Sequence, residues 1–197
     1  APGLYDLTEL QRDANKRFGY SAKETLNIMQ RLYESYKVLT YPRTDSRYIT
    51  TDVADTLKER LKACSVGPYR KLAGSLSMRP IRKNASFVDN KKVTDHHAII
   101  PTEQFVDLQT MTNEERKVYD LVVRRFLAVL LPAFEYDQTV FTGGLAGESF
   151  TAKGKIVKSQ GWKEAYENLE TDEEWEEADD LAAAPKEQTL PSVKKGD

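Results

Sequence analysis

Two side chains in the segment 39–48 have types and spacing that suit phosphoryl chemistry. Tyr41 precedes a proline, which disfavours helical geometry and predicts an extended residue on a stiff stretch of backbone. A phenol is a weak nucleophile near neutral pH, since its ordinary pKa is about 10. Arg43 is always charged and can bind a phosphate through two parallel hydrogen bonds. A guanidinium there would favour the phenolate and neutralise a phosphate under attack, as a tyrosine nucleophile requires. Taken alone, the tripeptide fits a structural tyrosine in a charged turn better.

The only two histidines, His96 and His97, are adjacent and lie within 94–102. Neighbouring side chains diverge on a strand, so we expect only one of them to face a given site. That histidine could hydrogen-bond a phosphate or hold a proton. A zinc site is not expected, because the single cysteine, Cys64, and two histidines do not complete a ligand set. On these residues alone, an ordinary capping or core histidine is the simpler interpretation.

The elements that must position these side chains are mainly helical in the first two thirds of the chain. We expect a first helix that is capped by Thr8 and ends near Phe18, with Gly19 as a left-handed stop. A capping box at 21–24 opens a second helix, which ends near Tyr36. Further helices are expected at 52–64, around 69–73, and from the capping box 112–115 to about Leu131.

After Pro132 the pattern changes from helical to β. Residues 135–142 and 149–157 alternate as strands do, and Gly143, Gly144 and Gly147 supply turn chemistry between them. We therefore expect an α+β fold, with a helical domain over 1–131 and a β-rich segment over 132–197. The stretch 164–180 holds 10 acidic residues, which repel one another, and is expected to be exposed and mobile.

Composition excludes several classes of protein. No apolar run approaches the roughly 20 residues that span a bilayer, so no membrane partner is expected. One cysteine excludes a disulfide framework and fits a reducing compartment. The net charge of −2 conceals a balance of +6 over 1–131 and −8 over 132–197. The cationic part suits a polyphosphate partner, although solvated surface explains the charge alone more simply. From its first and last residues, we expect the chain to be a fragment of a longer protein.

Together, the two motif stretches resemble the type IA DNA topoisomerases. Residues 30–34 and 39–46 are similar to that family's active-site tyrosine motif and the helix that leads into it. Residues 96–102 look like its downstream histidine motif, in the same order and at a matching separation. The Tyr-Pro-Arg form and the double histidine resemble the topoisomerase III branch of the family more than its topoisomerase I branch. The resemblance implies the helical lid domain of the enzyme's toroid, followed by part of its β-rich arch.

The resemblance also implies roles for individual residues. Tyr41 would form a 5′-phosphotyrosyl bond to one DNA strand, Arg43 would hold the scissile phosphate, and His96 would be the third catalytic residue. The expected DNA-binding residues are Arg31, Thr44, Asp45, Ser46, Arg47 and His97.

The activity implied for the whole enzyme is cleavage and religation of one strand without ATP, giving strand passage, relaxation of negative supercoils and decatenation. Mg²⁺ would be bound outside this fragment, which would therefore be inactive by itself. The expected partners are single-stranded DNA and the remaining domains of the same chain, with no oligomer indicated. The expected location is the bacterial cytoplasm, at the nucleoid.

Two other classes compete with this interpretation. A helix-turn-helix-like DNA-binding module without chemistry would read bases with one helix and would tolerate the loss of the Tyr41 hydroxyl. A tyrosine recombinase also makes a phosphotyrosyl bond, but it needs an Arg-His-Arg constellation ahead of a late tyrosine. Here Tyr41 precedes both histidines, so the order of the residues does not fit a recombinase.

Overall fold

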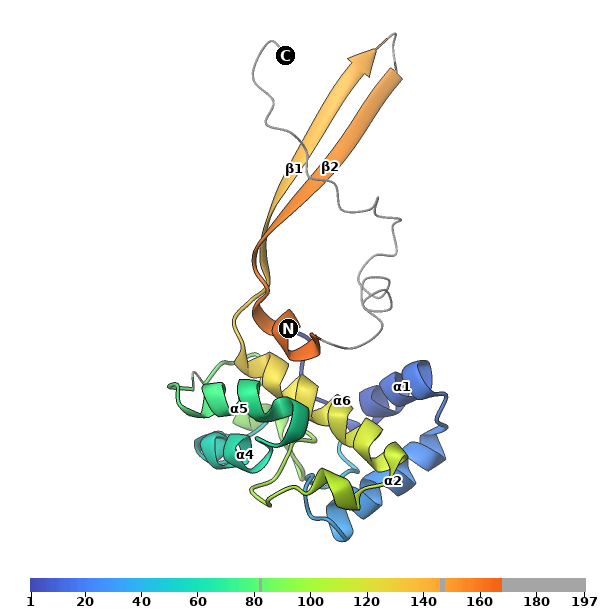
Figure 1. The fold of residues 1–197 in the computed structure, drawn as a ribbon, viewed down its shortest axis with the longest axis vertical. Coiled ribbons are helices and arrows are strands. Elements are labelled where there is room, and N and C mark those ends of the chain that lie inside the picture. Colours follow the sequence, from blue (N-terminus) through green and yellow to red (C-terminus); the bar gives the residue numbers. More distant parts are fainter. Residues whose placement is uncertain (82, 146–147, 168–197) are drawn as a thin grey trace. The chain divides into compact units, whose positions relative to one another are not determined.

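The computed structural model describes residues 1–81, 83–145 and 148–167, and it divides the chain into two compact units, Ala1–Pro132 and Ala133–Asp197 (Figure 1). The first unit is helical and the second contains a two-stranded antiparallel sheet, so the expected α+β class is confirmed. Within the described ranges, no helix is both long enough and apolar enough to cross a membrane.

The first unit is built around its longest helix, α6 (Asn113–Leu130), which packs against α1, α2 and α5 (Figure 1). Apolar side chains on several sides of α6, among them Val118, Leu121 and Val123, are almost completely buried. Hydrophobic burial around this helix therefore holds the unit together. The other helices are α1 (Leu7–Phe18), α2 (Ala22–Glu34), α3 (Thr51–Asp55), α4 (Leu57–Ala63) and α5 (Arg70–Ser77), with short 3-10 turns at Gly67–Tyr69, Asn90–Lys92 and Leu108–Thr110.

The helix ends follow local hydrogen bonding, with one correction. Asp6, not Thr8, caps α1, since its carboxylate accepts a hydrogen bond from the backbone N–H of Glu9 at 2.7 Å. The carboxylate of Asp6, one residue before the first helical turn, satisfies the free backbone N–H of Glu9. Thr8 lies inside that turn, and its hydroxyl does not reach this N–H group. Gly19 ends α1 with φ 71°, as expected. The capping boxes that open α2 and α6 are both confirmed.

The helix expected over 52–64 is two helices, α3 and α4, separated at Thr56. The Thr56 hydroxyl donates to the backbone oxygen of Val53 at 2.9 Å and accepts a hydrogen bond from Nε of Arg60 at 2.8 Å. Local hydrogen bonds of a threonine hydroxyl compete with the regular backbone hydrogen bonds of an α-helix. The apolar periodicity is continuous across the break and did not reveal it.

The second unit pairs β1 (Glu135–Leu145) with β2 (Glu148–Ser159), followed by the 3-10 helix η4 (Gly161–Tyr166). Both strands were expected, but Gly143 and Gly144 lie inside β1, opposite Phe150 and Ser149, instead of forming the turn. Glycine weakens a strand without preventing its pairing, so the strands extend further than the residue types suggested. Gly147 and residues 168–180 of the acidic stretch lie outside the described residues. In the described part of that stretch Glu164 and Glu167 are exposed, but Ala165 and Tyr166 are buried, so the expected exposure is wrong for these two.

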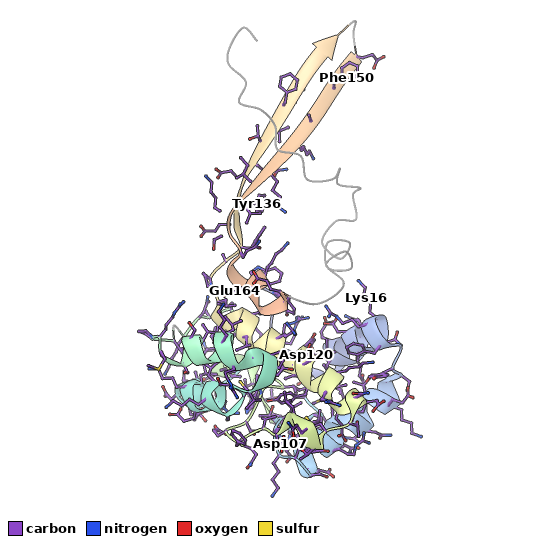
Figure 2. The ribbon with its side chains drawn as sticks, in the orientation of Figure 1. Lys16, Asp107, Asp120, Tyr136, Phe150 and Glu164 are labelled. Atoms are coloured by element: carbon purple, nitrogen blue, oxygen red, sulfur yellow. The ribbon has the colours of Figure 1, made fainter. Side chains whose placement is uncertain are left out.

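Apolar side chains project from both strands of this hairpin. Tyr136 and Phe150, both labelled on the hairpin in Figure 2, are 46% and 58% exposed. On the same hairpin, Lys155 lies over the rings of Tyr136 and Phe134, with its ammonium 4.8 and 5.1 Å from the two centroids. These cation–π contacts cover part of the apolar surface near the start of β1.

A buried carboxylate ties α2 to α6. Glu115, which is 2% exposed, accepts a hydrogen bond from Nε of Arg31 at 2.6 Å and from the hydroxyl of Tyr36 at 2.9 Å. The oxygen that accepts from Tyr36 also closes the capping box by accepting from the backbone N–H of Thr112 at 2.9 Å. Burial by itself raises the pKa of Glu115, but these hydrogen bonds outweigh it and lower that pKa below its ordinary value.

We predict that Glu115→Ala lowers the free energy of unfolding by about 2 kcal/mol, because it removes several charge-assisted hydrogen bonds at once. Urea denaturation followed by circular dichroism measures this change. Glu59→Ala is the matched control, since Glu59 is exposed on α4, and we expect it to change stability by less than about 0.5 kcal/mol. Equal effects of the two substitutions would contradict the role given to Glu115.

Candidate functional site

The site is assembled where two segments far apart in the sequence pair through their backbones. Leu39 and Pro101 form an antiparallel bridge. The backbone N–H of Thr40 donates to the oxygen of Ile100 at 3.0 Å, and the Thr40 hydroxyl accepts from the Ile100 N–H at 3.0 Å and donates to the oxygen of Ala98 at 3.2 Å. Leu39, Ala98 and Ile100 are completely buried. The tyrosine motif and the histidine motif are therefore fixed against each other.

The pairing brings the ring of Tyr41 to two other rings. Its centroid lies 4.1 Å from that of His96, with the planes tilted by 33°, and 5.5 Å from that of Tyr33 in an edge-on contact at 84°. Tyr41 is half-buried and His96 is exposed. Among the described residues, the Tyr41 hydroxyl has no hydrogen-bond partner. The ring is thus held in position while the oxygen stays available to a ligand.

Within the described part of the chain, Arg43 and Asp45 are exposed and form no hydrogen bond or ion pair. Arg43 follows Tyr41 by two residues on the same loop, and its exposed guanidinium is available to an anion. A fork of N–H groups of this kind suits a phosphate.

Other residues of the expected site have structural partners. Thr44 and Ser46 are buried, and their hydroxyls donate to the backbone oxygens of His96 at 2.9 Å and Lys92 at 2.8 Å. Arg47 donates through Nε to the backbone oxygen of Leu4 at 3.1 Å. Arg31 forms the ion pair with Glu115 described above. The structure thus shows Thr44 and Ser46 shaping the loop, whereas DNA contact by these four residues stays a prediction.

His97 is half-buried, and its Nδ1 lies 2.8 Å from the backbone oxygen of Ala98. In the neutral ring, Nδ1 therefore carries the proton and donates it, which leaves Nε2 as an acceptor. Burial lowers the pKa of His97, and the nearby charge of Arg60 lowers it further. The two histidines both adjoin Tyr41, one through ring contact and one through a shared groove, although we expected only one to face the site. Residues 94–96 form a bend and His97 is not in a strand, so the alternation of a strand does not apply.

An open groove of about 580 Å³ lies beside Tyr41. It is lined by Tyr33, Glu34, Lys37, Leu39, Thr40, Tyr41, His97 and Thr102. Sequence reasoning did not assign Tyr33, Glu34 or Lys37 to the site, and it placed residues 30–34 only in the helix that leads into the tyrosine motif. The helix expected to end near Tyr36 ends at Glu34, and the position of these residues at the end of that helix or between it and the motif was the signal that could have placed them near Tyr41.

No three or more His, Cys, Asp or Glu side chains within residues 1–81, 83–145 and 148–167 form a group able to hold a metal ion. This part of the chain therefore offers no candidate for the Mg²⁺ that the resemblance implies.

Comparison with known proteins agrees with the geometry. The family model described as DNA topoisomerase matches residues 1–197. The chain is 62% identical over 197 residues to a DNA topoisomerase 3 of Bacillus cereus, and 54% identical to DNA topoisomerase 3 of Bacillus subtilis (strain 168). Each match covers 100% of this chain and 26% of the relative, so the chain spans about a quarter of the length of these curated relatives.

The fold is also found in a solved structure. Full-length topoisomerase I from Thermotoga maritima matches with a TM-score of 0.60 over 85% of this chain and 27% of that chain. At 22% sequence identity this likeness concerns the fold alone. Neither the DNA-binding module nor the recombinase is favoured by these matches, and the resemblance seen in the two motifs is confirmed: the chain belongs to the type IA DNA topoisomerase family and is a segment similar to its topoisomerase 3 members.

Proposed function

We propose that this chain carries the nucleophile with which a type IA topoisomerase cleaves and rejoins one strand of DNA. The observation that supports it is the placement of Tyr41, whose ring is held by His96 and Tyr33 while its hydroxyl and the nearby Arg43 have no partner among the described residues. Tyr41, Arg43 and His96 are the proposed catalytic residues.

The proposed reaction is a transesterification. The Tyr41 hydroxyl loses its proton and attacks the phosphorus, the bond from phosphorus to the 3′ oxygen breaks, and that oxygen takes up a proton. The products are a 5′-phosphotyrosyl bond and a free 3′ hydroxyl, and the reverse reaction rejoins the strand. Because the ester is exchanged and not hydrolysed, religation needs no ATP.

Each of these side chains has a separate role in the proposed reaction, which follows from its chemistry. Arg43 neutralises the phosphate and stabilises the charge that grows during attack. His96, which lies against the nucleophile, hydrogen-bonds the phosphate or holds a proton there. Thr44 acts indirectly, since its hydroxyl holds the backbone of His96.

The remainder of the enzyme supplies what this segment lacks. The chain spans only about a quarter of its relatives, and its described residues contain no metal-binding group. Mg²⁺ and further acidic groups would come from other domains, so the isolated segment is expected to be inactive.

For the whole protein we propose strand passage on single-stranded DNA, with relaxation of negative supercoils and decatenation, without an oligomer. A place in the bacterial cytoplasm at the nucleoid follows from the proposed substrate and stays a prediction.

We predict that Tyr41→Phe in the full-length protein abolishes the covalent protein–DNA adduct and leaves single-strand affinity within about twofold, because only the attacking oxygen is removed. Denaturing gels of protein trapped on a labelled oligonucleotide measure the adduct. Tyr48→Phe, which changes another tyrosine of the same loop, is the control and should retain it. Persistence of the adduct in Tyr41→Phe would refute the proposed function.

Replacing Arg43 tests the phosphate contact. We expect Arg43→Ala to slow cleavage by about 100-fold or more, since an interaction with developing charge is lost. Arg43→Lys keeps the charge but not the fork and should recover only part of the rate. Single-turnover cleavage measures these rates, and a normal rate in Arg43→Ala would rule out the assigned role.

The environment of His97 predicts its titration. NMR should give a midpoint below 6.5, the ordinary value, because burial and Arg60 disfavour the imidazolium. The unfolded chain then binds this proton more readily than the folded one, so stability falls as the pH is lowered through 6.5. The signal is assigned by its absence in His97→Gln, and a midpoint at or above 6.5 would contradict the burial argument.

A further inference from the structure

The groove beside Tyr41 contains groups that take no direct part in the proposed strand cleavage. The ring of Tyr33 is 36% exposed, although it is large and apolar. Lys37 is exposed and, among the described residues, forms no hydrogen bond or ion pair through its side chain. The volume of about 580 Å³ lies within the range of small-ligand sites.

The backbone beside this groove is fixed by hydrogen bonds. Lys37 has a φ of 58°, in the left-handed region, and its backbone oxygen accepts a hydrogen bond from the Thr102 hydroxyl at 2.6 Å. The backbone N–H of Thr102 donates in turn to the oxygen of Val38 at 3.0 Å. The Thr40 hydroxyl is occupied by its contacts with Ala98 and Ile100. Among the remaining lining residues, which include Glu34 and His97, Tyr33 offers an aromatic ring and Lys37 a cation on a fixed backbone.

An exposed aromatic ring combined with an available cation is the pattern that binds single-stranded nucleic acid, through base stacking and phosphate attraction. The ring of Tyr33 lies 5.5 Å from that of Tyr41. A strand whose phosphate reaches the Tyr41 hydroxyl therefore has one of its two flanking nucleotides beside the groove.

We propose that this groove binds the nucleotide next to the scissile phosphate, with its base stacked on Tyr33 and a neighbouring phosphate on Lys37. The inference rests on the proposed function, because it takes Tyr41 as the residue that attacks the strand. It assigns Tyr33 and Lys37 the task of placing the strand before cleavage.

The test measures single-strand affinity in the full-length protein carrying Tyr41→Phe, so that no cleavage occurs. An oligonucleotide with one mapped cleavage position is titrated by fluorescence anisotropy. Tyr33→Leu should weaken binding about 5- to 150-fold, the value of one base–aromatic stack. Phe105→Leu, which alters an aromatic residue that is 69% exposed and does not line the groove, should leave affinity unchanged.

Abasic oligonucleotides then identify the stacked base. Removing the base on one side of the cleavage position should weaken binding by the parent protein and abolish the difference between the parent and Tyr33→Leu. Removing the base on the other side should leave that difference intact.

Lys37→Gln provides a second and independent variant. Loss of one phosphate contact to a single strand should reduce the slope of log affinity against log salt by about 0.7. Lys23→Gln, at an exposed position near the start of the same helix that precedes the groove, should keep the slope.

The proposal is overturned if Tyr33→Leu binds as tightly as the parent, or if it loses the same factor on both abasic oligonucleotides. An unchanged salt slope in Lys37→Gln would overturn the phosphate contact. These failures are distinguishable from failure of the proposed function, because the covalent adduct is scored separately in protein that retains Tyr41.

Discussion

The arrangement of this site depends on one antiparallel contact between two short segments, 38–40 and 98–102. Thr40 uses both its backbone and its hydroxyl in this contact, so that three hydrogen bonds join it to Ala98 and Ile100. Burial of Leu39 and Ile100 supports the same pairing from within the core. Since buried polar groups are costly when unpaired, this geometry cannot loosen without a substantial penalty.

The side chains around this contact are of two kinds. Some hold the site together, and others remain available to a ligand. Thr44, Ser46 and Arg47 turn inward and bond the backbone of neighbouring segments. Tyr41 and Arg43 remain on the outside of the same loop. Under the proposed function, a nucleophile held by packed rings needs little reordering when its substrate arrives, and such pre-organisation is a main source of catalytic rate.

The sequence predicted local features well and non-local ones poorly. The capping boxes at Ser21 and Thr112 and the left-handed Gly19 were correct, because each depends on a few adjacent residues. The break at Thr56 and the inclusion of Gly143 and Gly144 in β1 were missed, since periodicity does not register a single competing hydrogen bond or the length of a strand pairing.

The site shows the same division. Two motifs indicated Tyr41, Arg43 and His96 through their residue types and their resemblance to a family. The hydrogen bond from Ile100 to Thr40 joins residues 60 positions apart, and no local sequence pattern predicted it. The groove with Tyr33 and Lys37, and the partners of Arg31 and Arg47, follow from that tertiary arrangement and became visible only in the structure.

The central claim is that Tyr41 is the residue that bonds covalently to DNA. The most direct measurement traps the full-length protein on a labelled single-stranded oligonucleotide, denatures and digests it, and sequences the peptide that retains the label. Our account predicts the label on Tyr41, linked to a 5′ phosphate. A label on any other residue, Tyr33 and Tyr48 included, would contradict it.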